Sequence, residues 1–202
     1  MKFKPIHLGQ SIIKYQVPLD IFQKINNIYE TKFHNLIPAN KQLIGKIKNE
    51  HSLFYNGEDE SKIKRHTFLT TEIINWFMDC YNHYLEYNKI KEYNPAHTHQ
   101  GTLFTGLSSV MILKLPDTYG EEYSALEQPQ NGKLQMFGCS SGQFSKIDYQ
   151  PSMDIRDFYI FPYDMRHAVY PFNGTEQTRR TLAANCDVEY NQMINKGAHD
   201  NN

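Results

Sequence analysis

The pattern of apolar residues changes near Asn88, and this change limits the class of fold that the chain can adopt. Before Asn88, apolar residues recur at helical spacing. After it, short runs rich in β-branched and aromatic residues are separated by Gly, Pro, Asn and Asp, which is typical of antiparallel strands joined by turns. We therefore expect a mainly β fold with N-terminal helices.

Two amphipathic helices are predicted before the change. The first covers about 19–34, where Asp20 can cap the helix and Ile21, Ile25 and Ile28 recur on one face. The second begins at Thr70 or Thr71. Its apolar stripe consists of Ile73, Trp76, Phe77, Cys80, Tyr81 and Tyr84. We expect this stripe to pack on a sheet.

Six strand segments are predicted after the change. They are 90–99, 106–116, 133–138, 157–162, 167–172 and 178–190. No segment repeats another, and no linker divides the chain, so we expect a single domain over 1–202. A helical buttress at about 19–87 would support a distorted barrel or jelly roll at about 88–190.

Charge and cysteine content exclude several classes of protein. The chain has 21 Lys and Arg against 22 Asp and Glu, so we expect neither nucleic acid nor a membrane surface as a partner. Cys80, Cys139 and Cys186 form no C-x-x-C pair, which suits a reducing compartment. Because MKFKPIHLGQ lacks the apolar core of a signal peptide and no apolar run reaches about 18 residues, we expect a cytoplasmic protein.

Two histidines in NPAHTHQG, His97 and His99, are candidate metal ligands. On a strand they would project from the same face, because side chains alternate in direction. Two imidazoles placed in this way can reach a single ion, and a catalytic centre needs about three protein ligands with open positions left over. The alternative is a pair of solvated histidines on a strand.

A third candidate ligand is His167, in DFYIFPYDMRHAVYPF. A buried strand is predicted to end at Pro162, and after a short loop His167 opens the next strand. This position at the entrance of a strand makes His167 the expected partner of the H-x-H pair.

A candidate anion-binding group follows in TRRTLAAN. If this segment is a strand, Arg179, Thr181 and Ala183 share one face and Arg180 lies on the other. One arginine would then point inward, where its guanidinium and a hydroxyl two residues on would suit a small carboxylate.

The order of these motifs resembles the 2-oxoglutarate/Fe(II)-dependent oxygenases. The motifs are His97-x-His99, an apolar strand ending at Pro116, GKLQMFG, RDFYIFP, His167-Ala-Val-Tyr-Pro-Phe, and Arg179-x-Thr181 leading to Asn185. They are most similar to small oxygenases of bacteria and marine phages, and the likeness covers about 88–190. The resemblance implies a double-stranded β-helix, a jelly-roll or cupin-like barrel, in the cytoplasm of a cell or of a virus's host.

The resemblance also implies a cofactor set and roles for the site residues. His97 and His167 would bind Fe(II), Arg179 would pair with the distal carboxylate of 2-oxoglutarate, and Thr181 would stand where the family has a supporting serine. The reaction would consume O2 and 2-oxoglutarate, release succinate and CO2, and hydroxylate a substrate. Peptidyl proline, amino acids, nucleobases and small metabolites all remain open as substrates, as does the oligomeric state.

One departure concerns His99, which stands where the family's metal motif has Asp or Glu. The centre could consist of three histidines, His97, His99 and His167. Alternatively, His99 could be the first ligand of an H-x-G motif with Gly101, as in halogenating relatives, or the chain could be a degenerate oxygenase. We favour three histidines, because His97 and His99 share a face.

A rival hypothesis is a non-catalytic, cupin-like barrel that binds a metal or another ligand with the same histidines. A cupin would have a glutamate a few residues after the H-x-H pair, and residues 100–110 contain none. The arginine that follows His167 also favours the oxygenase.

Overall fold

The fold is taken from a computed structural model, which describes residues 3–7, 11–39, 50–56, 65–88, 106–121, 129–138, 147–172 and 175–188. The chain divides into two compact units, one formed by 1–17 with 78–202 and the other by 18–77. The predicted strand at 90–99 lies outside the described residues.

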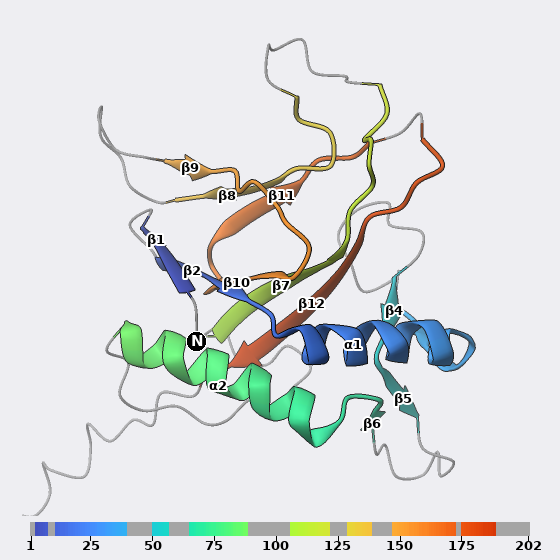
Figure 1. The fold of residues 1–202 in the computed structure, drawn as a ribbon. Coiled ribbons are helices and arrows are strands. Elements are labelled where there is room, and N and C mark those ends of the chain that lie inside the picture. Colours follow the sequence, from blue (N-terminus) through green and yellow to red (C-terminus); the bar gives the residue numbers. More distant parts are fainter. Residues whose placement is uncertain are drawn as a thin grey trace, which may run out of the picture. The chain divides into compact units, whose positions relative to one another are not determined.

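The larger unit is built on two antiparallel sheets (Figure 1). The first has the order β1-β2-β10-β7-β12, and the second has the order β11-β8-β9. Their strands are β1 (Phe3–His7), β2 (Ser11–Gln16), β7 (Gly106–Lys114), β8 (Leu134–Phe137), β9 (Asp148–Tyr149), β10 (Asp157–Pro162), β11 (Arg166–Val169) and β12 (Arg180–Asp187).

An apolar core fills the space between these two sheets. Tyr159 and Phe161 of β10 and Ile112 of β7 pack there against Leu134 and Met136 of β8, and each of the five is at most 2% exposed. Burying this many large side chains is the main favourable term in holding two sheets together. Among the described strands the sheets share no hydrogen-bonded edge, so the barrel is not closed by them.

The C-terminal part of α2 (Thr71–Tyr87) covers the opposite face of the five-stranded sheet. The Tyr81 hydroxyl lies 2.7 Å from Ser109 Oγ on β7, and the Tyr84 hydroxyl donates to the carbonyl of Ser11 on β2 at 2.7 Å. Cys80 accepts a hydrogen bond from the Tyr15 hydroxyl through its carbonyl oxygen, at 3.0 Å. The part of the predicted apolar stripe that belongs to the larger unit, Cys80, Tyr81 and Tyr84, therefore packs on a sheet.

The smaller unit contains the other helices and four short strands. They are α1 (Leu19–Lys32), the 3-10 helix η1 (Phe33–Asn35), β3 (Ile37–Pro38), β4 (His51–Ser52), β5 (Phe54–Asn56) and β6 (Arg65–Thr67). The strands pair antiparallel as β3 with β4 and β5 with β6. Within this unit Lys24 of α1 forms an ion pair with Glu72.

The mainly β composition with helices is confirmed, and both predicted helices are present. The strands β1 and β2, at residues 3–16, were not predicted, nor were the short strands of the smaller unit. The single domain and the double-stranded β-helix stay predictions. In the described part of the chain, no helix is both long and apolar enough to cross a bilayer.

Candidate functional site

The turn between β10 and β11 presents His167. Met165 closes this turn by donating from its backbone N–H to the carbonyl of Pro162 at 3.1 Å. The backbone N–H of Tyr163 donates to the carbonyl of Gly106 at the start of β7, at 3.0 Å. Strand β11 then pairs with β8, with His167 opposite Met136. His167 is therefore fixed at the beginning of a strand, where the sequence predicts it.

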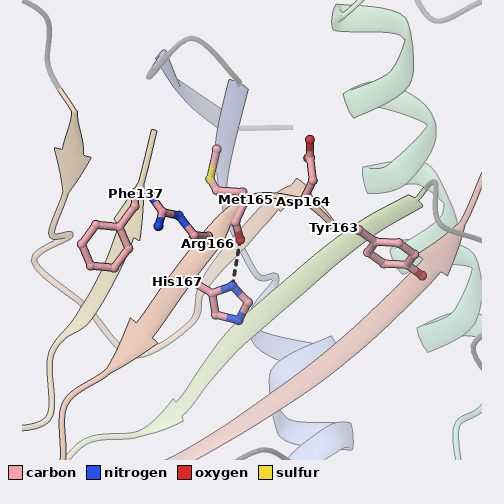
Figure 2. Close-up of a pocket in the computed structure, with 6 residues that line it drawn as sticks. All are labelled: Phe137, Tyr163, Asp164, Met165, Arg166 and His167. Atoms are coloured by element: carbon pink, nitrogen blue, oxygen red, sulfur yellow. Dashed lines mark hydrogen bonds between the residues drawn. The ribbon is translucent and has the colours of Figure 1, made fainter. Parts of the chain in front are cut away.

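The imidazole of His167 is oriented by the backbone (Figure 2). Its Nδ1 lies 3.1 Å from the carbonyl oxygen of Met165, and its ring packs edge-on to Phe161 at a centroid distance of 5.0 Å. Because a carbonyl can only accept, Nδ1 carries the hydrogen, and a neutral ring keeps its lone pair on Nε2. This is how protein histidines that bind metals through Nε2 are commonly held.

His167 borders an open depression in the surface, shown in Figure 2. Its lining residues are Phe137, Tyr163, Asp164, Met165, Arg166 and His167. The Tyr163 side chain extends away from His167 toward β12, where its hydroxyl donates to Asp187 Oδ1 at 2.8 Å. Burial and this carboxylate raise the pKa of Tyr163, so the phenol stays protonated and keeps its hydrogen bond to Asp187.

Gly106 is required by the close approach of two neighbours. A Cβ at this position would lie 2.3 Å from Cε2 of Tyr163 and 2.5 Å from the carbonyl oxygen of Cys186. The first of these atoms belongs to the Tyr163 ring, whose hydroxyl bonds to Asp187, and the second is backbone of β12. A side chain at Gly106 would therefore push apart the start of β7 and the turn that carries His167.

Arg179, immediately before β12, reaches toward the second sheet. Its Nη1 donates to the carbonyl oxygen of Gly132, just before β8, at 2.7 Å. In the described part of the chain no carboxylate pairs with this guanidinium. Burial lowers the pKa of Arg179, yet an arginine in a protein stays charged. Arg179 is therefore a partly buried cation, and its other N–H groups donate to no carboxylate in the described residues.

Register defines the faces of β12. Thr181 pairs with Ile112, which belongs to the core between the sheets, and Leu182 pairs with Met111 on the opposite face. Directly paired residues project to the same side, so Thr181 faces the space between the sheets. Arg180 pairs with Lys114, beyond a register shift. Because this shift, a β-bulge, lies between Arg180 and Thr181, simple alternation does not assign a face to Arg180.

Two residues beside Arg179 had not been singled out from the sequence. Gly132 has a φ of 67°, and a Cβ there would lie 2.1 Å from Cε1 of Tyr119. The Tyr119 ring in turn packs edge-on to Phe172 at 5.2 Å. The Asn131-Gly132 pair is a turn signal that the sequence offered, whereas nothing local pointed to Tyr119.

The turn before β10 contains a residue with a left-handed backbone, Arg156. Arg156 has a φ of 76°, a conformation that glycine adopts freely and a larger residue adopts only at a cost in energy. The Arg156 Nε donates to the carbonyl of Val17 at 2.8 Å. Next to it, the buried carboxylate of Asp157 forms an ion pair with Lys14 Nζ through Oδ2, at 2.7 Å.

His97 and His99 lie outside the described residues, so their contacts with His167 stay predictions. Among the residues that the structure does describe, no group of three His, Cys, Asp or Glu side chains could hold a metal ion. The structure thus describes His167, Arg179 and Thr181 of the predicted site.

Comparisons with known proteins gave one distant structural likeness. No family model matches the chain, and no curated protein matches it. A crystal structure of a Pseudomonas putida prolyl-4-hydroxylase is similar with a TM-score of 0.49 and 12% identity, over 88% of this chain and 93% of that one. A likeness of this extent identifies no family, so we build the functional proposal on the chain's own residues.

Proposed function

We propose that the chain is an Fe(II)- and 2-oxoglutarate-dependent dioxygenase that hydroxylates its substrate. The balanced reaction takes one O2, one 2-oxoglutarate and a substrate C–H, and gives succinate, CO2 and a substrate C–OH. The observation that carries the proposal is the guanidinium of Arg179. It is partly buried, donates to the carbonyl of Gly132 just before β8, and has no carboxylate partner in the described ranges.

The donor set suits a metal with open positions. His97, His99 and His167 would hold Fe(II), with His167 binding through Nε2 because its Nδ1 is committed to the Met165 carbonyl. Bound Fe(II) would supply the activation of O2 and the oxidising power for hydroxylation. The protein's own contribution is to fix the ring of His167 by the β10–β11 turn and by Phe161.

Arg179 would position the co-substrate by its distal carboxylate. A guanidinium presents two parallel N–H donors that match a carboxylate, and such charge-assisted pairs are the strong ones in proteins. Thr181 projects from β12 into the same space between the sheets and would donate its hydroxyl to the same group. Arg180, which pairs with Lys114 beyond the β-bulge, would have no such role.

The decisive experiment is an anaerobic titration of the purified protein with Fe(II) and 2-oxoglutarate. A bound 2-oxo acid gives Fe(II) a weak visible metal-to-ligand charge-transfer band. We expect the band in the wild type, no band in His167→Ala, and a band that needs far more 2-oxoglutarate in Arg179→Ala.

Wild-type protein that binds Fe(II) without developing the band would refute the dioxygenase. It would leave the non-catalytic, cupin-like metal-binding barrel as the surviving alternative. Protein that binds neither Fe(II) nor 2-oxoglutarate would instead indicate a degenerate oxygenase. Circular dichroism of each variant separates loss of the site from loss of the fold.

A further inference from the structure

The depression beside His167 contains a cation that the proposed reaction does not use, the guanidinium of Arg166. Both residues line the depression, together with Phe137. Arg166 is exposed, and among the described residues its side chain forms no ion pair and no hydrogen bond. An uncommitted guanidinium next to a candidate metal ligand can recognise an anionic group on a molecule that reaches the metal.

The acidic residue of the same depression does not neutralise this charge. Figure 2 shows the Asp164 carboxylate pointing away from both Arg166 and His167. Its electrostatic effect is on α2 instead, where burial and, after it, the Asp164 carboxylate raise the pKa of Tyr84. The part of the depression at Arg166 is therefore positive and attracts anions.

Strand pairing places an aromatic ring beside the guanidinium. Arg166 opens β11 opposite Phe137, the last residue of β8, and directly paired residues project to the same side. Figure 2 shows the Arg166 side chain extending toward Phe137, whereas His167 extends from the other side of the strand. Phe137 is half-buried, so part of its ring remains available for apolar contact.

Arg166 and Arg179 are associated with opposite ends of β8. Arg179 donates to the carbonyl of Gly132, just before the strand begins. Arg166 pairs with Phe137, where the strand ends. Because a strand rises about 3.3 Å per residue, the two ends of this four-residue strand lie roughly 10 Å apart. A 2-oxoglutarate held by Arg179 therefore leaves Arg166 free to bind a second anion.

We propose that Arg166 and Phe137 bind the substrate of the proposed dioxygenase, and that this substrate carries a carboxylate or phosphate group next to an apolar body. The inference rests on the proposed function, because it takes the depression at His167 to be the place where the substrate meets the metal. Arg166 and His167 leave β11 on opposite sides, so the anionic group lies several bonds from the carbon that is hydroxylated.

The test uses the Mn(II)-loaded full-length chain, saturated with 2-oxoglutarate so that Arg179 is occupied. The probes are 3-phenylpropionate, phenyl phosphate and the neutral 3-phenylpropionamide. Calorimetry gives their dissociation constants, and the Mn(II)-induced relaxation of their ring protons in NMR shows whether they bind near the metal. The variant is Arg166→Gln, and Arg180→Gln is the matched control because it removes the same charge from β12.

We expect both anionic probes to bind the wild type more tightly than the amide does, with enhanced relaxation of their ring protons. Arg166→Gln should weaken both anions roughly 3- to 10-fold, since an exposed charge-assisted hydrogen bond is lost, and should leave the amide unchanged. Arg180→Gln should match the wild type. Tighter binding of phenyl phosphate would assign a phosphate ester, and tighter binding of 3-phenylpropionate a carboxylate.

Two results overturn the inference while the dioxygenase proposal stands. One is an amide that binds the wild type as tightly as the anions do, and the other is an Arg166→Gln variant that binds the anions as the wild type does. Failure of the proposed function looks different: Fe(II) and 2-oxoglutarate give no charge-transfer band, although the anions still bind in a manner that depends on Arg166. Equal melting temperatures of the variants and the wild type exclude a loss of fold as the cause.

Discussion

Arg179 Nη1 lies 2.7 Å from the carbonyl oxygen of Gly132, so the start of β12 is tied to the turn that leads into β8. This bond joins one sheet of the larger unit to the other at the level of the proposed carboxylate site. It also distinguishes Arg179 from Arg180, the strand residue that pairs with Lys114.

The first prediction compares these two arginines. Arg179→Gln should weaken 2-oxoglutarate binding to the metal-loaded protein roughly 10- to 100-fold, because a charge-assisted pair is lost. Arg180→Gln makes the same chemical change one residue away and should leave the dissociation constant within about twofold of the wild type. Calorimetry measures both constants, and a larger effect at Arg180 would reverse the assignment.

The second prediction concerns the ligands of Fe(II). Iron retained after dialysis should fall severely in His97→Ala, His99→Ala and His167→Ala if the centre consists of three histidines. Retention in His97→Ala together with loss in His99→Ala would instead support the H-x-G alternative. Elemental analysis gives the iron content, and His34→Ala in the smaller unit serves as the control.

A third prediction tests the contact between Gly132 and Tyr119. Gly132→Ala should be destabilising by several kcal/mol, because the added methyl group meets the Tyr119 ring and the backbone is left-handed. In a Tyr119→Ala background the collision disappears, and only the backbone cost of about 1–2 kcal/mol should remain. Urea unfolding of the four proteins gives the coupling energy, and strict additivity would argue against the contact.

A fourth prediction isolates the backbone strain at Arg156, whose φ is 76°. Arg156→Ala and Arg156→Gly both remove the hydrogen bond to Val17, but only glycine adopts a left-handed conformation without a steric penalty. The glycine variant should therefore be about 1 kcal/mol more stable than the alanine variant. Equal stability of the two in urea would mean that the turn relaxes in solution.

The fifth prediction concerns thiol reactivity. Burial raises the pKa of the Cys186 thiol to about 12, with a further contribution from Asp187, and burial also raises the pKa of Cys80. At about pH 8 only roughly one in ten thousand Cys186 thiols is then ionised, and the thiolate is the reactive form.

Native protein carrying Cys139→Ser should therefore react very slowly with Ellman's reagent at about pH 8, and raising the pH should speed the reaction. The same protein in concentrated guanidinium chloride should release two equivalents at once. Rapid reaction of the folded protein would contradict the burial of both side chains.

Elements of both units could be predicted from the sequence because their signals are local. In DFYIFP the strand β10 is a continuous apolar run that ends at a proline, and α1 shows isoleucines at helical spacing. His167 could be found because it follows such a run directly. Patterns of this kind depend on neighbours along the chain, which the sequence displays.

The strands β1 and β2 were missed because their stability comes from distant residues. Lys14 breaks the apolar pattern of β2, yet its charge is paired with Asp157 on β10. Pro5 is tolerated because β1 is the outermost strand of its sheet among those described. Tyr119 was missed for the same reason, since its partner Gly132 belongs to a different turn.

The position of β2 has a consequence for the order in which the chain can fold. Ser11–Gln16 are synthesised long before Asp157–Pro162, yet β2 pairs on one side with β10. Closing so long a loop is entropically slow, and it cannot begin on the ribosome until β10 has emerged. During translation the β1–β2 hairpin therefore has no β10 to pair with, and its apolar side chains lack these packing partners. We expect the expression yield to depend on chaperones that bind the exposed hairpin during this period.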